Sequence, residues 1–160
     1  MSEPIDFPVN LDRIVVLRSV VESVMTFNPA AQNVPEIPSL GFRLDINPDN
    51  SQQIGALMQL VINQGKSSNC PYHIEIECAA NFRVKDSISQ AQALEIVGIV
   101  AQQSLYGSIR EFVLSITSRH VNGPYMLGLL LLQPPIVHPP NPEASPALDG
   151  SIRSNPEALD

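Results

Sequence analysis

The sequence is poor in the residues that many binding and catalytic functions require. Tryptophan is absent and aromatic residues make up only 5% of the chain, so a core must consist mainly of aliphatic side chains. Lysine and arginine number 9 against 16 acidic residues, which gives a formal net charge of −7. Because nucleic-acid binding depends on clustered basic residues, this balance predicts no nucleic-acid partner. An acidic surface instead suits solubility and basic partners.

Cysteine is scarce as well. The two cysteines, Cys70 and Cys78, have no pair of histidines nearby. Structural zinc sites usually contain a close cysteine pair, so we predict no metal site. Cys78 is expected to be a small core residue. Free thiols of this kind are typical of a reduced, cytoplasmic protein.

Long hydrophobic runs are also missing. The longest, Met126 to Leu132, is interrupted by Gly128 and is far shorter than the ~20 residues that a membrane span requires. No charged and then apolar leader opens the chain, so we expect neither a secretory signal nor membrane insertion.

Catalytic motifs are not apparent. The three histidines, His73, His120 and His138, are scattered, and there is neither a nucleophile elbow nor a phosphate-binding glycine loop. We therefore predict no catalytic residues, no cofactor and no enzymatic activity. Glu75 and Glu77 leave alternatives open, because paired carboxylates can perform acid–base chemistry when burial separates their pKa values. A solvated acidic strip is the simpler interpretation, and a docking site for a basic partner is its functional form.

The rest of the sequence is patterned. Residues 1–10 are expected to form a flexible arm. Leu11–Phe27 is rich in valine and isoleucine, and its apolar residues fit either a helix or a strand. β-branched side chains favour the pleated form, so propensity favours a strand. Both faces of that strand would be apolar, and both would require a cover or a partner.

Three further strands are expected, at Phe42–Ile46, Ile54–Ile62 and Tyr72–Lys85. Each places apolar residues at every second position. The alternation is clearest in the last, where Glu75 and Glu77 share the polar face with His73. This pattern predicts an antiparallel strand with one face in water.

At Gln90–His120 the apolar period changes to three or four residues, which predicts a helix. Asp86 or Ser87 is expected to cap it. Gly98 and Gly107 each cost ~1 kcal/mol relative to alanine inside a helix. We therefore predict a long bent helix, with a bend or break near Gly107.

Asn122-Gly-Pro124 is expected to stop this helix, and a short leucine-rich segment extends from Tyr125 to Gln133. Residues 134–160 are rich in proline, asparagine, serine and acidic residues. Such a composition lacks the apolar surface needed to offset ordering entropy, so we predict a disordered tail.

Four strands followed by one long helix form an α+β layout. In four segments this sequence resembles the SecB family of export chaperones and its SecB-like relatives. The segments are Gly41-Phe-Arg-Leu-Asp-Ile46, Ala79-Ala-Asn-Phe-Arg-Val84, Leu105-Tyr-Gly-Ser-Ile-Arg-Glu111 and Thr117-Ser-Arg119. Gly107 stands where the family has a helix-breaking proline. The resemblance covers roughly Leu11 to Pro135, and we expect a SecB-like domain over residues 11–133.

The resemblance implies a four-stranded antiparallel sheet with helical cover on one side, assembled as a homodimer or homotetramer. It also implies a holdase for protein export that holds unfolded or nascent polypeptides in apolar grooves. The residues expected in or beside such a groove are Phe42, Leu44, Met58, Phe82 and Tyr106. Family members dock on the translocation motor SecA through acids on the exposed sheet face, and the resemblance places Glu75 at one such position. With Glu77 on the same face, we predict partner docking at Glu75 and Glu77.

Two departures from the family pattern limit this expectation. Arg18 stands near the position of a second docking acid, and Pro134–Pro140 replaces the final helix, which is expected to be absent. A dedicated client such as an antitoxin is therefore as plausible as general export. The alternatives are an oligomeric scaffold that binds no unfolded clients and, more weakly, an enzyme that uses His73 with Glu75 or Glu77.

Overall fold

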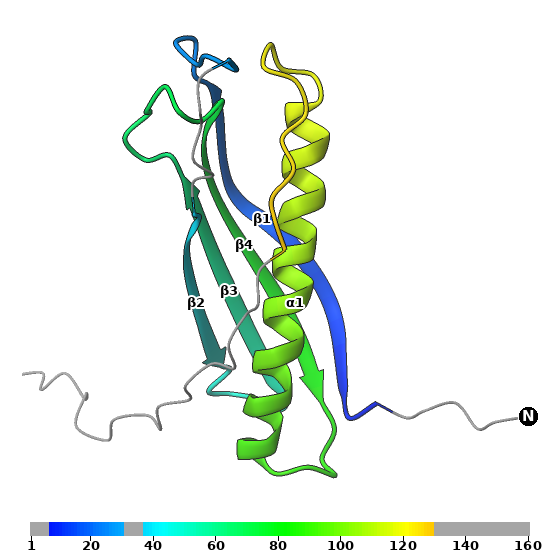
Figure 1. Cartoon of the computed structure of the whole chain (residues 1–160). Coiled ribbons are helices and arrows are strands. Elements are labelled where there is room, and N and C mark those ends of the chain that lie inside the picture. Colours follow the sequence, from blue (N-terminus) through cyan, green and yellow to red (C-terminus); the bar gives the residue numbers. More distant parts are fainter. Residues whose placement is uncertain (1–6, 31–36, 130–160) are drawn as a thin grey trace, which may run out of the picture.

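The computed structural model describes residues 7–30 and 37–129, and it consists of a sheet covered on one face by a helix (Figure 1). The elements are β1 (Val9–Ser23), β2 (Ser39–Ile46), β3 (Gln53–Ile62), β4 (Tyr72–Val84) and α1 (Gln90–Thr117). All strand pairs are antiparallel, and the spatial order is β1-β4-β3-β2. The predicted α+β class, the four-stranded antiparallel sheet and the long helix are confirmed. Among the described residues, no helix combines the length and the apolar character that crossing a membrane requires.

The two central strands supply most of the core. Their alternating residues are buried on the face that α1 covers. The register joins these rows, since Met58 lies opposite Cys78 and Ile54 opposite Phe82. Directly opposed residues project from the same face of an antiparallel sheet, so the two rows form one apolar layer.

The helix α1 begins at a capping box formed by Ser89 and Gln92, and not at Asp86 or Ser87 as predicted. It continues through Gly98 and Gly107, so the break that the sequence suggested does not occur. Residues at four-residue spacing are buried along its whole length: Ala93, Val97, Ala101, Leu105, Ile109, Val113 and Thr117. Tertiary packing of this stripe outweighs the intrinsic cost of the two glycines.

The strand β1 settles the ambiguity of the first apolar segment in favour of a strand. It begins at Val9, two residues inside the expected flexible arm, and ends at Ser23, before the predicted end at Phe27. It lies at one edge of the sheet, and among the described residues it pairs with β4 alone. Four of its apolar side chains are 37–56% exposed: Leu11, Val15, Val16 and Leu17.

Candidate functional site

The opposite edge strand, β2, carries an apolar row that the helix leaves partly uncovered. Leu40, Phe42 and Leu44 lie opposite Leu60, Met58 and Ala56 of β3, and therefore on the face that α1 covers. Their side chains are only half-buried. The helix crosses the other strands while β2 lies outside it (Figure 1). This uncovered row, which we call the β2 trough, is defined by Leu40, Phe42 and Leu44.

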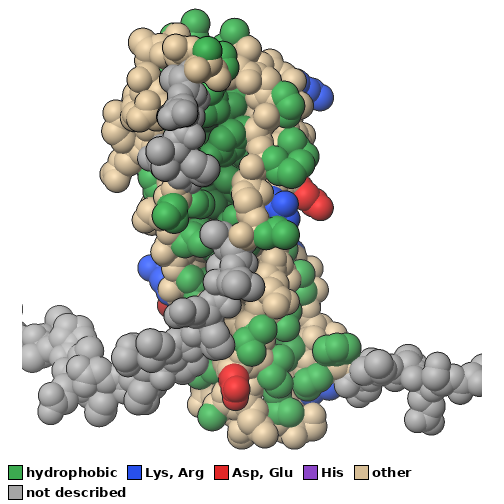
Figure 2. All heavy atoms as spheres, viewed as in Figure 1, with side chains coloured by type: hydrophobic (Ala, Val, Ile, Leu, Met, Phe, Trp, Pro, Cys, Tyr) green, Lys and Arg blue, Asp and Glu red, His purple; other side chains and the backbone are tan. Residues whose placement is uncertain are grey.

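The surface beside the β2 trough is hollowed. Figure 2 shows hydrophobic side chains gathered in a hollow between the helix side of the molecule and the β2 side. Within the described residues, β2 pairs only with β3, so its outer backbone groups have no strand partner. An apolar row beside an open strand edge is a geometry that accepts an extended chain by strand addition.

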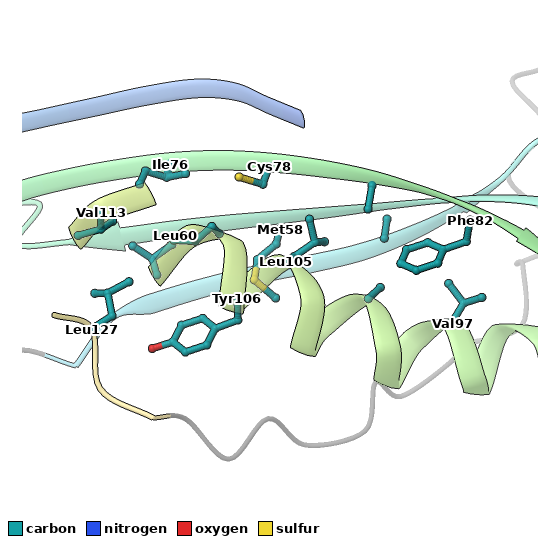
Figure 3. Packing of buried hydrophobic residues seen from close by; sticks show 14 of the residues in the cluster. Met58, Leu60, Ile76, Cys78, Phe82, Val97, Leu105, Tyr106, Val113 and Leu127 are labelled. Atoms are coloured by element: carbon teal, nitrogen blue, oxygen red, sulfur yellow. The ribbon is translucent and has the colours of Figure 1, made fainter. Parts of the chain in front are cut away.

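Of the five residues expected to line a groove, two lie in the β2 trough and three do not. Phe42 and Leu44 are half-buried on β2. Met58 and Phe82 are each 1% exposed, and Figure 3 shows them against the helix residues Leu105 and Val97. Tyr106 is also buried, on α1 itself. A ligand in the trough would therefore contact Phe42 and Leu44 directly, while the other three form the layer beneath.

Residues 122–129, which we call the return segment, run back along α1 after the helix ends (Figure 1). The Tyr125 N–H donates to Thr117 Oγ1 at 2.8 Å, Arg110 Nε donates to the Leu127 carbonyl at 3.0 Å, and the Tyr106 hydroxyl donates to the Gly128 carbonyl at 2.7 Å. The bonded helix positions move towards the start of α1 as the return segment advances. The return segment is therefore antiparallel to the helix.

The return segment also contributes to the core. Leu127 is buried and projects towards the sheet near Leu60 in Figure 3. Burial raises the pKa of Tyr106, while the nearby Arg110 guanidinium opposes that rise, so the hydroxyl is a proton donor at neutral pH. The sequence predicts Tyr106 as a groove residue, and Arg110 belongs to one of the segments that resemble the SecB family. The structure adds that both bind the backbone of the chain's own return segment.

The face of the sheet turned away from α1 carries the two predicted docking acids. Glu75 and Glu77 do share this face, but Arg18 Nη2 lies 2.9 Å from Glu75 Oε2. The Glu75 side chain is 24% exposed, and its other oxygen lies 3.4 Å from His73 Nε2. The position at which the resemblance expected a second acid therefore holds a cation that neutralises the first.

His73 departs from the prediction of a fully solvated face, because it is only 6% exposed. Its Nδ1 lies 3.0 Å from the carbonyl oxygen of Asn63, a residue in the turn between β3 and β4. The Asn63 side chain fixes this turn through bonds to the backbone of Ser67. A buried imidazole held in this way is poorly placed to receive a substrate. His120 is bonded to Ser23 instead, and His138 lies outside the described residues.

Both cysteines are buried, and Cys70 Sγ donates to the carbonyl oxygen of Tyr72 at 3.3 Å. Burial raises the pKa of Cys78 to about 11, so its thiol stays protonated at neutral pH and is a poor nucleophile or metal ligand. Within the described part of the chain, no three potential metal-ligating side chains gather at one place. The predicted tail, residues 134–160, lies outside the described residues, and so does the segment in which the final helix is expected to be absent.

Neither a protein-family model nor a curated protein matches this sequence. Solved structures do match. A structure of the SecB-like chaperone of Mycobacterium tuberculosis, in complex with a ChAD peptide from the HigA1 antitoxin, is 21% identical with a TM-score of 0.57. The match covers 79% of this chain and 93% of that chain. The chain therefore has a SecB-like fold.

A second match is to a protein of unknown function from Streptococcus agalactiae. It has 12% identity and a TM-score of 0.46, and it covers 76% of this chain and 97% of that one. A similarity at this level carries no weight for function.

Proposed function

We propose that this protein is a SecB-like, non-catalytic chaperone that holds extended segments of unfolded polypeptides in the β2 trough. The observation that carries the proposal is the half-buried apolar row of β2 beside an unpaired strand edge. The fold adds support, since the mycobacterial SecB-like chaperone of the same fold was solved with a peptide from an antitoxin. A polypeptide ligand fits both observations.

The forces available in the trough suit broad recognition. The free edge of β2 offers backbone hydrogen bonds, which any sequence except proline can match. Each large apolar side chain that a client buries contributes ~1.5–3 kcal/mol before the cost of ordering the client. A client with apolar residues at alternate positions would match the two-residue period of Leu40, Phe42 and Leu44.

A dedicated client in the cytoplasm, of the kind an antitoxin represents, is the preferred form of this function. The reason is the ion pair between Arg18 and Glu75, which removes a free acid from the exposed sheet face. Docking on the motor SecA through acidic side chains would leave the Arg18 cation facing a basic partner. Protein export is therefore the second form of the same chaperone function.

The chaperone is proposed to assemble through β1. Leu17 is 56% exposed, and it lies on an edge strand that also exposes Leu11, Val15 and Val16. A second copy could cover this strand by antiparallel pairing, which would satisfy its backbone and bury its side chains together. A homodimer would form in this way, and a homotetramer would require a further contact between dimers.

Suppression of client aggregation tests the proposal. The purified protein at several-fold excess should prevent light scattering by heated citrate synthase and by diluted, unfolded luciferase. Leu44→Ser should weaken this suppression because it removes one residue of the trough. Leu57→Ser is the matched control, since Leu57 is half-buried on the opposite face of the neighbouring strand.

The outcome separates the candidate functions. Loss of suppression in L44S with retention in L57S supports the chaperone. A folded, oligomeric wild-type protein that suppresses neither client overturns the chaperone proposal and leaves the scaffold function in its place.

A further inference from the structure

Gln102 is a buried polar residue of α1 that has no hydrogen-bond partner in the described part of the chain. It is 8% exposed. Asn63, His73 and Thr117 are buried polar residues as well, and each of them makes a side-chain hydrogen bond. A buried amide without a partner is costly, so such a group usually marks a place where water or a ligand binds. Gln102 is therefore a candidate contact for a ligand.

The side of α1 that carries Gln102 is the side that faces β2. Gln102 lies one turn before Tyr106, whose hydroxyl binds the return segment, and side chains four residues apart lie on the same side of a helix. The return segment runs on the β2 side of α1 (Figure 1), and its Leu127 lies near Leu60 in Figure 3. The Gln102 side chain is therefore directed towards the β2 trough.

The position of Gln102 along the trough follows from its neighbours. In Figure 3, Leu105 of α1 lies near Met58, and Met58 is opposite Phe42 of β2. α1 begins at the end of the sheet at which β2 ends (Figure 1). Gln102 is three residues closer to that end than Leu105, a rise of ~4.5 Å along the helix. It therefore lies across the trough at a level between Phe42 and Leu44.

The surroundings of Gln102 favour a neutral ligand. The three residues that define the trough are apolar, and the charged residues of β2, Arg43 and Asp45, project from the opposite face as an ion pair of 3.3 Å. Arg110, two turns further along α1, is held by the Leu127 carbonyl. A charged client side chain at Gln102 would lose its hydration without gaining a counterion. A second carboxamide both donates to and accepts from the first, so it satisfies Gln102 best.

We propose that Gln102 is a specificity-determining residue of the β2 trough and binds an asparagine or glutamine side chain of an extended client. A client that pairs with the edge of β2 directs every second side chain towards the helix side of the sheet. Apolar side chains of that row bury against Leu40 and Phe42, and the carboxamide that follows them pairs with Gln102. The inference rests on the proposed chaperone function, and it specifies the class of client segment.

A comparison of two peptides tests the role of Gln102. Both are fluorescein-labelled and have leucine at alternate positions with serine between, and the middle leucine is replaced by glutamine in one and by methionine in the other. Gln102→Met should lower the preference for the glutamine peptide over the methionine peptide about tenfold, because the buried carboxamide of the client loses its partner. Gln102→Leu, the second variant, should give the same fall. The matched control is Gln103→Met, which changes the exposed neighbour and should keep the wild-type preference.

The outcomes separate the role of Gln102 from the chaperone function. If both peptides bind and both Gln102 variants keep the wild-type preference, the role of Gln102 is overturned and the chaperone proposal stands. An equal fall in Gln103→Met also overturns it, since the loss then does not depend on the buried amide. If the folded wild-type protein binds neither peptide, the role of Gln102 fails, and the chaperone proposal fails with it when client aggregation is not suppressed either.

Discussion

The two edge strands of the sheet expose different surfaces. The strand β1 has 15 residues and exposes apolar side chains on both faces. The strand β2 has 8 residues, and its apolar side chains share one face and are half-buried. An edge that is apolar on both faces needs a cover of matching length, which a second copy of the same strand would supply in the proposed dimer. A short edge strand that is apolar on one face suits a ligand that binds reversibly.

The largest expected difference is between a substitution in the core under α1 and one in the β2 trough, measured as the loss in the free energy of unfolding. Met58→Ala removes a side chain that is 1% exposed, and it should lower the free energy of unfolding by ~2–5 kcal/mol. Leu44→Ala removes a half-buried side chain, so its cost should be clearly smaller. Urea unfolding followed by circular dichroism measures both. Equal costs would mean that the trough belongs to the core.

A lysine introduced into β1 and a lysine introduced into β2 should have different effects on self-association and on client binding. Leu17→Lys, on β1, should weaken self-association by about one to two orders of magnitude, because a buried leucine contributes ~1.5–3 kcal/mol. Leu44→Lys, on β2, should leave the oligomer intact and reduce client binding. Native mass spectrometry together with client titration separates the two effects. An unchanged mass for L17K would contradict assembly through β1.

The smallest expected effect comes from a substitution on the outer side of the helix α1. An added Cβ at Gly107 meets no atom within 4 Å, so Gly107→Ala should raise the free energy of unfolding by up to ~1 kcal/mol. Its mass and client affinity should stay unchanged, because neither edge strand is altered. A lower melting temperature would show that Gly107 needs a backbone that alanine resists, or that another subunit lies against it.

The sequence predicts best those elements in which buried residues recur at regular spacing. β3 and β4 were predicted within one residue at each end, because one face of each strand is buried along its whole length. Only the middle of the buried α1 stripe, Val97, Ala101 and Leu105, was also visible, and Ser89 rather than Asp86 or Ser87 caps the helix. The spacing of apolar residues indicates which face of a strand or helix is buried. It does not indicate which other segment packs on that face.

The site depended on contacts that are distant in the sequence. Alternation could not show that Met58 and Phe82 lie under the helix while Phe42 and Leu44 lie beside it. Nor could it show that Tyr106 and Arg110 bind the return segment, since those bonds span 22 and 17 residues. The burial of His73 likewise comes from a turn ten residues away. Such placements follow from topology.

Hydrogen–deuterium exchange with and without a bound client tests the central claim most directly. Addition of reduced, carboxymethylated α-lactalbumin should slow deuterium uptake in peptides that cover Ser39–Ile46, because the client pairs with the open edge of β2. Uptake in peptides that cover Val9–Ser23 should not change, since the second copy of the proposed dimer would already cover β1. Protection of β1, or protection of neither strand, would contradict the assignment of the client to β2.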